Sequence, residues 1–387
     1  MKNNTTPWSI DLDARISELK TAKKSGKKIA VIIYSNKDLY SSFRYRAFNM
    51  YESTKNYSKK WQLVFFFENE LTELKKQLKN VDLLIFGRLE RWQLQYDDLA
   101  ITARNYGAKI AFDLDDCICG TKYIRNMFNV VAPDTVDQDY WISKSAHMEM
   151  ISQLVDGFIA TNEYLGKILS DSHDKKPYRV IPNFLNQVQI KASEEILSRD
   201  RTKTESDIFT IGYFSGSHTH ATDFEVIYPE LIQLLENHPN FKLKIVGMLP
   251  LPHSAEALVK NGQIEFIKLV DFLTLQRLLA SVDVNVAPLA DNVFTNCKSE
   301  LKFFEAALMK TSTIASPTFI FKKAIKNNET GLLCRPGEWT DAILKIYNDK
   351  DFAKAISNEA YAYTLETYHP EKVVKQIEDA YDFFSQQ

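Results

Sequence analysis

Lys302 and Glu305 stand three residues apart in the stretch ELKFFEAAL, just after Ser299. The apolar residues around them recur at helical spacing, which predicts a helix that Ser299 caps and that carries both charged side chains on one polar side. The β-branched run DVNVAPL precedes this helix and TIAS follows it. The segment therefore predicts a strand–helix–strand unit.

Such a unit suits a phosphorylated ligand. A helix N-terminus at the carboxyl edge of a parallel sheet offers free N–H groups to a phosphate. Lys302 would add a positive charge there, and Glu305 would accept hydrogen bonds from sugar hydroxyls. The alternative is an ordinary solvated ion pair on the surface of a helix.

Three aspartates follow an apolar run in the stretch KIAFDLDDCICG: Asp113, Asp115 and Asp116. Crowded carboxylates suit acid–base chemistry because their charges shift one another's pKa. An apolar strand followed by D-x-D also resembles the first motif of haloacid dehalogenase phosphatases, but Cys117 stands where that family usually has a threonine. A third interpretation is that one aspartate simply caps the following turn.

Two further loops follow predicted strands. In NKDLYSSFRYRAF, Arg44 and Arg46 suit a phosphate or carboxylate because guanidinium groups pair with both in bidentate geometry; the alternative is a pair of surface arginines. In a later loop, a glycine between two serines lets the backbone approach a phosphate. The candidates in that loop are Ser215, Gly216, Ser217 and His218. His218 and His220 lack a third nearby ligand, so no metal site is predicted.

Strands alternate with helical segments along the chain, which indicates parallel sheets covered on both faces. The strands predicted in the first half are KIAVIIYS, WQLVFFFE, VDLLIFGRL, KIAFDLDD, GFIATN and YRVIPN. Those predicted in the second half are FTIGYFS, FKLKIVGM, IEFIKLV, DVNVAPL and TIAS. Residues 1–27 are expected to form a polar helical lead-in, and residues 187–207, which are polar and charged, to form a linker.

The bulk properties exclude several classes of protein. The chain has 387 residues, 45% of them hydrophobic, which is enough for two globular domains. A net charge of −2 gives no general attraction to nucleic acid. Four scattered cysteines and an N-terminus without an apolar signal core predict a cytoplasmic protein. No apolar run approaches the roughly 20 residues of a membrane span, so any membrane contact is expected to be peripheral, at the inner face.

The stretch K-x-F-E-A-A-L, followed by a strand that ends in A-S-P, resembles the nucleotide-sugar motif of retaining glycosyltransferases with the GT-B fold, family four, also called group 1. In that family the glutamate binds the ribose and the lysine faces the diphosphate, which the resemblance transfers to Glu305 and Lys302. The first glutamate of the usual E-x7-E pattern would fall on Cys297, and Glu300 is a nearby substitute out of register. The resemblance covers most of the chain and is strongest over residues 211–337.

The resemblance implies an α/β fold of the GT-B type, with two Rossmann-like doubly wound domains facing a central cleft. The expected acceptor domain spans residues 1–190 and the donor domain residues 205–369, and a C-terminal helix at about 370–387 crosses back onto the first domain. Donor-binding roles are implied for Ser215, Gly216, Ser217, His218, Ser299, Glu300, Lys302 and Glu305. Arg44 and Arg46 would contact the acceptor, and Asp113, Asp115 and Asp116 would line the cleft as catalytic residues. The family's usual Arg or Lys in the turn at Gly216 is absent, so Lys302 would carry more of the diphosphate contact.

The implied activity is transfer of a sugar, with retention, from a nucleotide diphosphate sugar to a glycan or lipid-linked acceptor (EC 2.4). The implied pathway is bacterial surface polysaccharide biosynthesis. No metal or other cofactor is expected besides the nucleotide-sugar co-substrate. Two alternatives remain: a catalytically silent GT-B partner subunit, and a nucleotide-sugar epimerase or phosphatase.

Overall fold

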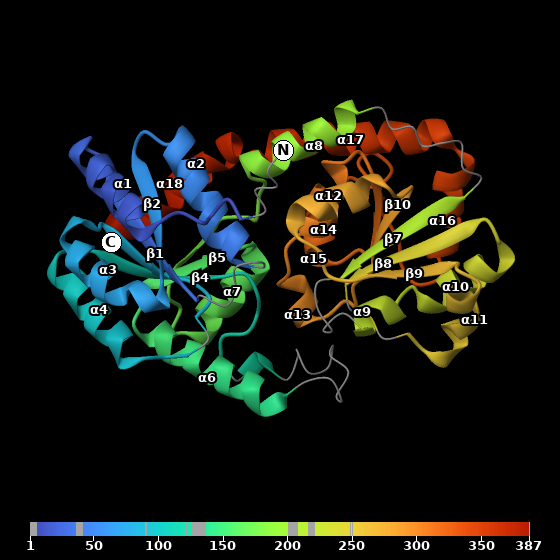
Figure 1. Cartoon of the computed structure of the whole chain (residues 1–387). Coiled ribbons are helices and arrows are strands. Elements are labelled where there is room, and N and C mark those ends of the chain that lie inside the picture. The colour runs from blue at the N-terminus through green and yellow to red at the C-terminus, as the bar shows by residue number, and fades with distance from the viewer. Residues whose placement is uncertain are drawn as a thin grey trace.

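The computed structural model describes residues 6–35, 42–89, 91–120, 122–124, 137–199, 208–215, 221–247, 249 and 251–386. These residues form two lobes, each built on a six-stranded sheet with helices on its faces (Figure 1). All the strand pairs within both sheets are parallel. The predicted fold class, two Rossmann-like domains with parallel sheets, is confirmed.

The N-terminal sheet has the strand order β2-β1-β3-β4-β5-β6. Its strands are β1 (Lys28–Tyr34), β2 (Trp61–Phe67), β3 (Leu83–Phe86), β4 (Lys109–Leu114), β5 (Gly157–Ala160) and β6 (Tyr178–Val180). Its helices are α1 (Leu12–Lys24), α2 (Asn49–Tyr57), α3 (Leu71–Gln77), α4 (Leu94–Asn105), α6 (Gln138–Gln153) and α7 (Glu163–Ser172), with short turns η1 (Arg44–Phe48), η2 (Glu68–Glu70) and η3 (Leu78–Asn80). Strands such as β1, KIAVIIY, are continuous apolar runs because helices cover both faces of the sheet.

The C-terminal sheet has the order β12-β11-β10-β7-β8-β9. Its strands are β7 (Phe209–Ser215), β8 (Phe241–Gly247), β9 (Ile264–Ile267), β10 (Val284–Ala287), β11 (Ser312–Ala315) and β12 (Leu332–Leu333). Its helices are α9 (Ala221–Glu225), α10 (Tyr228–Asn237), α11 (Glu256–Lys260), α12 (Phe272–Ala280), α13 (Val293–Asn296), α14 (Leu301–Ala307), α15 (Phe319–Ala324) and α16 (Trp339–Asn348), with the short turn η6 (His253–Ala255). The two-residue strand β12 was not predicted from the sequence.

The described chain passes between the lobes twice, and helices lie at both crossings. Residues 187–207 were expected to be a linker, and the described part of them, residues 187–199, contains the helix α8 (Gln187–Ser198), which the sequence analysis did not predict. The Asn186 side chain accepts a hydrogen bond from the Gln189 N–H and so caps α8. In the C-terminal tail, α17 (Lys350–Tyr368) follows the C-terminal lobe, and α18 (Pro370–Gln386) lies against the N-terminal lobe (Figure 1).

Specific contacts hold α18 on the N-terminal lobe. The Trp61 indole N–H donates to Asp382 over 2.9 Å, and the Ser58 hydroxyl donates to Glu378 over 2.6 Å. The Leu185 N–H donates to the Tyr368 carbonyl over 3.0 Å, so the two crossings between the lobes lie side by side. The last helix therefore belongs to the N-terminal lobe in space although it ends the chain.

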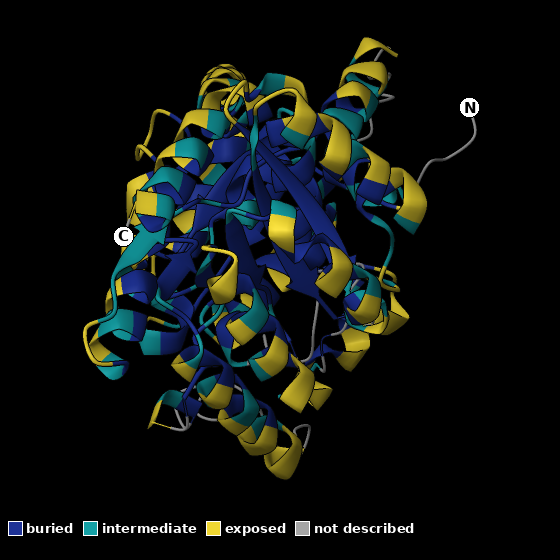
Figure 2. Cartoon of the chain, turned by 90° about the vertical axis from the view of Figure 1, so that its left-hand side faces the viewer, coloured by how far each residue is buried: buried dark blue, intermediate teal, exposed yellow. Residues whose placement is uncertain are grey.

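Apolar side chains fill both lobes, and the sheets are buried while the outer faces of the helices are exposed (Figure 2). One apolar cluster joins the lobes: it contains Phe43 and Phe48 from the first, and Phe303 and Phe304 from the second. In the described part of the chain, no helix is long and apolar enough to cross a membrane.

Candidate active site

A cavity of about 500 Å³ lies between the lobes and is lined by residues from both. It opens where strands of the two sheets end, as expected for parallel α/β sheets. Ser215 follows from the end of β7, and Asp115 and Asp116 come directly after β4. The charged side chains in its lining are Arg44, Arg88, Asp115, Asp116, Lys298, Lys302 and Glu305.

Lys302 lies in the first turn of α14 and lines this cavity. Its Nζ atom is buried and has no hydrogen-bond partner among the described residues. The ammonium lies 5.0 Å from the centre of the Tyr213 ring. Burial lowers the pKa of Lys302 to about 8, against a weaker opposing effect of Asp223. A buried ammonium that has no partner in the described part of the chain and faces a cavity is suited to bind an anionic ligand.

Glu305, one turn further along α14, is bound by the other lobe. Arg44 donates from Nη2 over 2.9 Å and Tyr45 from its hydroxyl over 2.5 Å, both to Oε1. Gln189 donates to the same oxygen over 3.3 Å, which leaves Oε2 without a donor in the described part of the chain. Burial raises the pKa of Tyr45 well above its usual range, so this hydroxyl keeps its proton and donates. The predicted donor residue Glu305 and the predicted acceptor residue Arg44 thus form one ion pair across the cleft.

Arg44 keeps free donors after this pairing. Its Nε and Nη1 atoms are buried and without a partner among the described residues. The guanidinium lies over the Tyr45 and Phe272 rings, at 4.2 and 4.8 Å from their centres. Burial lowers the pKa of Arg44, but the neighbouring Tyr45 and Glu305 outweigh that effect and the pKa is raised overall. Arg44 is therefore charged, oriented and still able to bind an anion.

Arg46 and Asp113 form a different kind of pair. The two side chains are 1% exposed and joined by two hydrogen bonds of 2.8 Å, from Nε and Nη2 of the guanidinium to the two carboxylate oxygens. Arg46 also donates to the Ile181 carbonyl over 2.7 Å and to the Asn183 side chain over 3.1 Å. Burial raises the pKa of Asp113, and the Arg46 charge opposes that rise.

Neither Arg46 nor Asp113 belongs to the lining of the cavity. The expectation that Asp113 lines the cleft therefore needs correction, because both oxygens of its carboxylate accept hydrogen bonds from Arg46 and the pair lies outside the cavity lining. The same correction applies to Arg46 as an acceptor contact. The π-helical turn η1 explains the different fates of the two arginines, because it turns Arg44 toward α14 and Arg46 toward β4.

Asp115 and Asp116 do line the cavity, and a residue missed by the sequence analysis holds them. Arg88 donates from Nη1 to Asp116 over 3.0 Å and to Asp115 over 3.4 Å. The two carboxylates are 12% and 22% exposed, so they remain open to a ligand. Arg88 follows β3 just as the aspartates follow β4, and this position after a strand was the available signal.

The remaining predicted donor residues have separate positions. Ser299 lines the cavity and accepts a hydrogen bond from the Asn183 side chain over 2.9 Å, but it does not cap α14, whose N-cap residue is Glu300.

Glu300 lies outside the cavity lining and accepts a hydrogen bond from the Tyr368 hydroxyl over 3.0 Å. Burial raises the pKa of Glu300. Its carboxylate therefore does not replace the missing glutamate of the E-x7-E pattern in this arrangement.

Cys297, at the position of that missing glutamate, is fully buried. The neighbouring Cys117 thiol and burial together raise its pKa. The Asn162 side chain donates to the Cys297 carbonyl over 3.2 Å and to the Lys298 carbonyl over 3.0 Å, so the backbone here is fixed by the N-terminal lobe.

Ser215 ends β7 and lines the cavity. Gly216, Ser217 and His218, and also His220, lie outside the described residues.

Residues 208–349 match the family model described as "Glycosyl transferases group 1". This segment contains β7 to β12 together with Lys302 and Glu305. It is a group 1 glycosyltransferase domain. The chain is accordingly a glycosyltransferase, and enzymes of this family use nucleotide-sugar donors. No protein of curated function matches the sequence significantly.

Solved structures of glycosyltransferases share the fold across both lobes. HepE from Anabaena, in complex with UDP and glucose, aligns with a TM-score of 0.60 at 13% identity, covering 92% of this chain and 100% of HepE. Sucrose-phosphate synthase from Thermosynechococcus elongatus aligns with a TM-score of 0.62 at 15% identity, covering 93% and 100% of the two chains. A glycosyltransferase from Rickettsia africae aligns with a TM-score of 0.62 at 13% identity, covering 92% and 98%. These likenesses confirm the GT-B fold.

Proposed function

We propose that this glycosyltransferase binds a uridine diphosphate sugar in the cavity between its lobes and transfers the sugar with retention of configuration. The observation that carries the proposal is that two buried positive groups in one cavity keep N–H donors without a partner among the described residues. These donors are Nζ of Lys302, and Nε and Nη1 of Arg44. Two buried positive groups in one place call for a ligand with more than one negative charge, as a nucleoside diphosphate has. Uridine is the base chosen because HepE, which shares the fold, binds UDP.

Each charged group has a role in this proposal. Lys302 and Arg44 hold the diphosphate and stabilise the charge that develops on it as the bond to the sugar breaks. The Oε2 atom of Glu305 accepts from the ribose hydroxyls, while Oε1 stays bound to Arg44. Because Arg44 then touches both the donor phosphate and the donor-lobe glutamate, donor binding and lobe closure are coupled.

Asp115 and Asp116 are the proposed catalytic residues. Both reach the cavity with partly exposed carboxylates that Arg88 keeps in place. Such carboxylates bind hydroxyls of the transferred sugar or stabilise positive charge at its anomeric carbon. The leaving diphosphate would accept the proton of the acceptor on the same face of the sugar, so this proposal requires no metal ion.

The proposed acceptor is a glycan or a lipid-linked sugar in bacterial surface polysaccharide biosynthesis, reached from the cytoplasm at the inner face of the membrane. The resemblance to group 1 glycosyltransferases supports this acceptor class. An acceptor of this kind would enter from the N-terminal lobe, beside Asp115 and Asp116.

Thermal shift with UDP, GDP, dTDP, ADP and CMP, and with their common sugar conjugates, tests the donor. A ligand present at 100 times its dissociation constant stabilises by about 2.7 kcal/mol, which is readily measured. We expect a selective shift by UDP and its sugars, lost in Lys302→Met and in Glu305→Gln but kept in Lys322→Met, which removes an exposed lysine. A shift by another diphosphate alone would overturn the choice of uridine, and equal shifts in all the variants would overturn the site.

Retention is tested on the product. Released UDP is measured with and without lipid-linked and oligosaccharide acceptors, and the anomeric configuration of the new bond is read by NMR. UDP release that needs an acceptor, with the donor's configuration kept in the product, is the expected result. Release of free sugar without any acceptor would instead indicate a hydrolase.

A further inference from the structure

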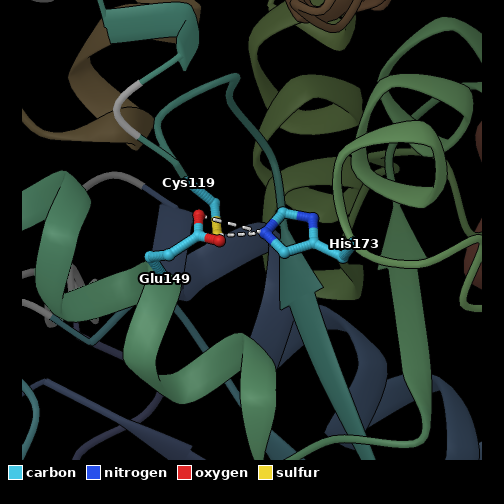
Figure 3. Close-up of side chains that lie close together, drawn as sticks. All are labelled: Cys119, Glu149 and His173. Atoms are coloured by element: carbon cyan, nitrogen blue, oxygen red, sulfur yellow. Dashed lines mark hydrogen bonds and ion pairs between the residues drawn. The ribbon is translucent and has the colours of Figure 1, made fainter.

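Three side chains with metal-binding chemistry meet in the N-terminal lobe, outside the lining of the cavity. They are Cys119, in the loop after β4, Glu149 on α6, and His173 at the end of α7. Figure 3 shows the thiol, the carboxylate and the imidazole pointing toward one another. Their candidate ligand atoms all lie within 4.8 Å of one another. Successive members of this cluster are 30 and 24 positions apart in the sequence, so no short sequence motif predicts it.

The imidazole is fixed with one nitrogen facing the other two groups. Nδ1 of His173 lies 2.7 Å from the Leu169 carbonyl, and a carbonyl oxygen can only accept, so Nδ1 carries the proton. The ring also packs on Phe158, with the ring centres 5.0 Å apart. Nε2 therefore faces Cys119 and Glu149, and its lone pair points at both groups when this nitrogen carries no proton. A histidine oriented by a carbonyl on its other nitrogen is the usual arrangement for a metal ligand.

The distances fit a tetrahedral ion. With a Zn–S bond of about 2.3 Å, and Zn–N and Zn–O bonds of about 2.0 Å, tetrahedral angles place S and N about 3.5 Å apart and N and O about 3.3 Å apart. The observed separations are 3.7 Å from Cys119 Sγ to His173 Nε2, and 3.2 Å from His173 Nε2 to Glu149 Oε2. Both separations from His173 Nε2 thus match those of a tetrahedral zinc site, and the sulfur and the carboxylate oxygen lie within 4.8 Å of each other.

We propose that Cys119 Sγ, His173 Nε2 and Glu149 Oε2 bind one zinc ion, with water as the fourth ligand. On binding, the Cys119 thiol loses its proton to solvent, as does Nε2 of His173 where it carries one. The thiolate and the carboxylate together then balance the two positive charges of the ion. A neutral complex suits this place because Cys119 and His173 are buried. The Glu149 side chain is 40% exposed, so water can reach the fourth position.

Gly120 leaves room for the carboxylate of this site. A Cβ atom at Gly120 would lie 2.7 Å from Oε2 of Glu149, closer than such atoms approach. The backbone of Gly120 also has a φ of +91°, which favours glycine. A side chain at this position would push the carboxylate away from the two other ligands.

The ion would have a positioning role for the active site. Cys119 stands three residues after Asp116, in the loop that carries the acidic side of the cavity. Binding would tie this loop to α6 and α7, and so fix the place of Asp115 and Asp116. The inference does not depend on the identity of the sugar donor, since no ligand atom belongs to the cavity.

Metal content and cobalt substitution test the proposal on the full-length protein without an affinity tag. Elemental analysis after purification from zinc-supplemented medium should find about one zinc per chain. Replacing zinc by cobalt(II) should give the intense visible bands of a tetrahedral site and a thiolate-to-cobalt charge-transfer band in the near ultraviolet. Zinc should also raise the melting temperature of protein treated with a chelator.

Variants assign the ligands. Cys119→Ser should lose the charge-transfer band, and His173→Ala and Glu149→Gln should each weaken zinc binding at least about tenfold. Cys334→Ser, which removes a buried thiol in the C-terminal lobe, is the matched control and should keep both band and affinity. Wild-type protein with no zinc, no cobalt bands and no thermal shift would overturn the proposal without reference to any variant. A charge-transfer band that survives in Cys119→Ser would overturn the assignment of the sulfur ligand.

Discussion

Replacing Lys302 by methionine is expected to stabilise the protein and to weaken nucleotide binding at the same time. Burial lowers the pKa of Lys302 from 10.5 to about 8. Each pKa unit is worth about 1.36 kcal/mol, so the shift corresponds to roughly 3 kcal/mol by which the folded protein disfavours the charged side chain. Methionine fills similar space without a charge. We therefore expect Lys302→Met to raise the free energy of unfolding at pH 7 by up to about 3 kcal/mol.

The sign of the pH dependence follows from the direction of the shift. The pKa of Lys302 is lower in the folded protein than in the unfolded chain, so its penalty is fully present below about pH 8 and disappears as the pH rises toward 10.5. The stability gained by Lys302→Met should shrink over the same interval. Urea unfolding of both proteins at pH 7 and pH 9 measures this difference, and other titrating groups cancel in the comparison.

Nucleotide binding to the wild-type protein should weaken as the pH rises. A diphosphate pairs with the ammonium and raises the pKa of Lys302 in the complex, so affinity falls once the free protein loses that proton. For a pKa of about 8, the charged fraction falls about tenfold between pH 7 and pH 9, and the dissociation constant should rise by about the same factor. This corresponds to about 1.4 kcal/mol.

Isothermal titration calorimetry with UDP at pH 7, 8 and 9 measures the effect. Wild type and Lys322→Met, the control that removes an exposed lysine, should show the rise in dissociation constant. Lys302→Met should bind weakly and equally at all three pH values. A wild-type affinity that does not change with pH, or a Lys302→Met protein as weakly stable as wild type, would refute the reasoning from the buried ammonium.

Three further predictions separate structural from catalytic residues. Asp113→Asn should lower the free energy of unfolding by about 3 to 5 kcal/mol, because it leaves the Arg46 charge buried without its partner, while the UDP affinity of the folded fraction stays unchanged; urea unfolding and calorimetry measure the two. Asp115→Asn and Asp116→Asn should reduce kcat at least about 100-fold with UDP affinity within about threefold of wild type, and steady-state UDP release checks this. Cys297→Glu, which restores the family's first glutamate, should destabilise rather than activate the enzyme, because a carboxylate would be buried beside Cys117; thermal melting and the transfer assay decide it.

Each of these predictions has a contrary result. Unchanged stability in Asp113→Asn would show that the carboxylate is not needed to hold Arg46. Full transfer by both Asp115→Asn and Asp116→Asn would remove the acidic loop from the mechanism. A stable and faster Cys297→Glu enzyme would mean that the cleft can place a carboxylate at that position.

Most strands and the helix that carries Lys302 and Glu305 can be predicted from short segments of the sequence. Strands buried on both faces are nearly continuous apolar runs, so runs such as KIAVIIY in β1 and WQLVFFF in β2 can be recognised as strands from the sequence. The motif around Lys302 and Glu305 is likewise local, because one short helix carries both residues. The two-residue strand β12 escaped prediction because so short a segment has no period.

Helix α8 has local helix signals in its sequence, but the polar composition of the segment favoured the interpretation as a linker. Asn186 provides an N-cap, and the buried residues Gln189, Ile190 and Ser193 lie on one face. Charged residues dominate the other face and the segment that follows. The segment therefore has the composition of a linker, and only the packing of its narrow buried face decides that it is a helix.

The sequence by itself determined two parallel α/β domains, a nucleotide-sugar motif on α14 and acidic and basic loops after strands, because each rests on neighbouring residues. Only the tertiary structure decided which charges meet. It paired Arg46 with Asp113 and Arg44 with Glu305, and among the described residues it gave the Lys302 ammonium no acceptor. It also brought together Cys119, Glu149 and His173 from three separate elements. The physical reason is that the energy of a charge depends on what surrounds it after burial, and those surroundings come from residues that are remote in the chain.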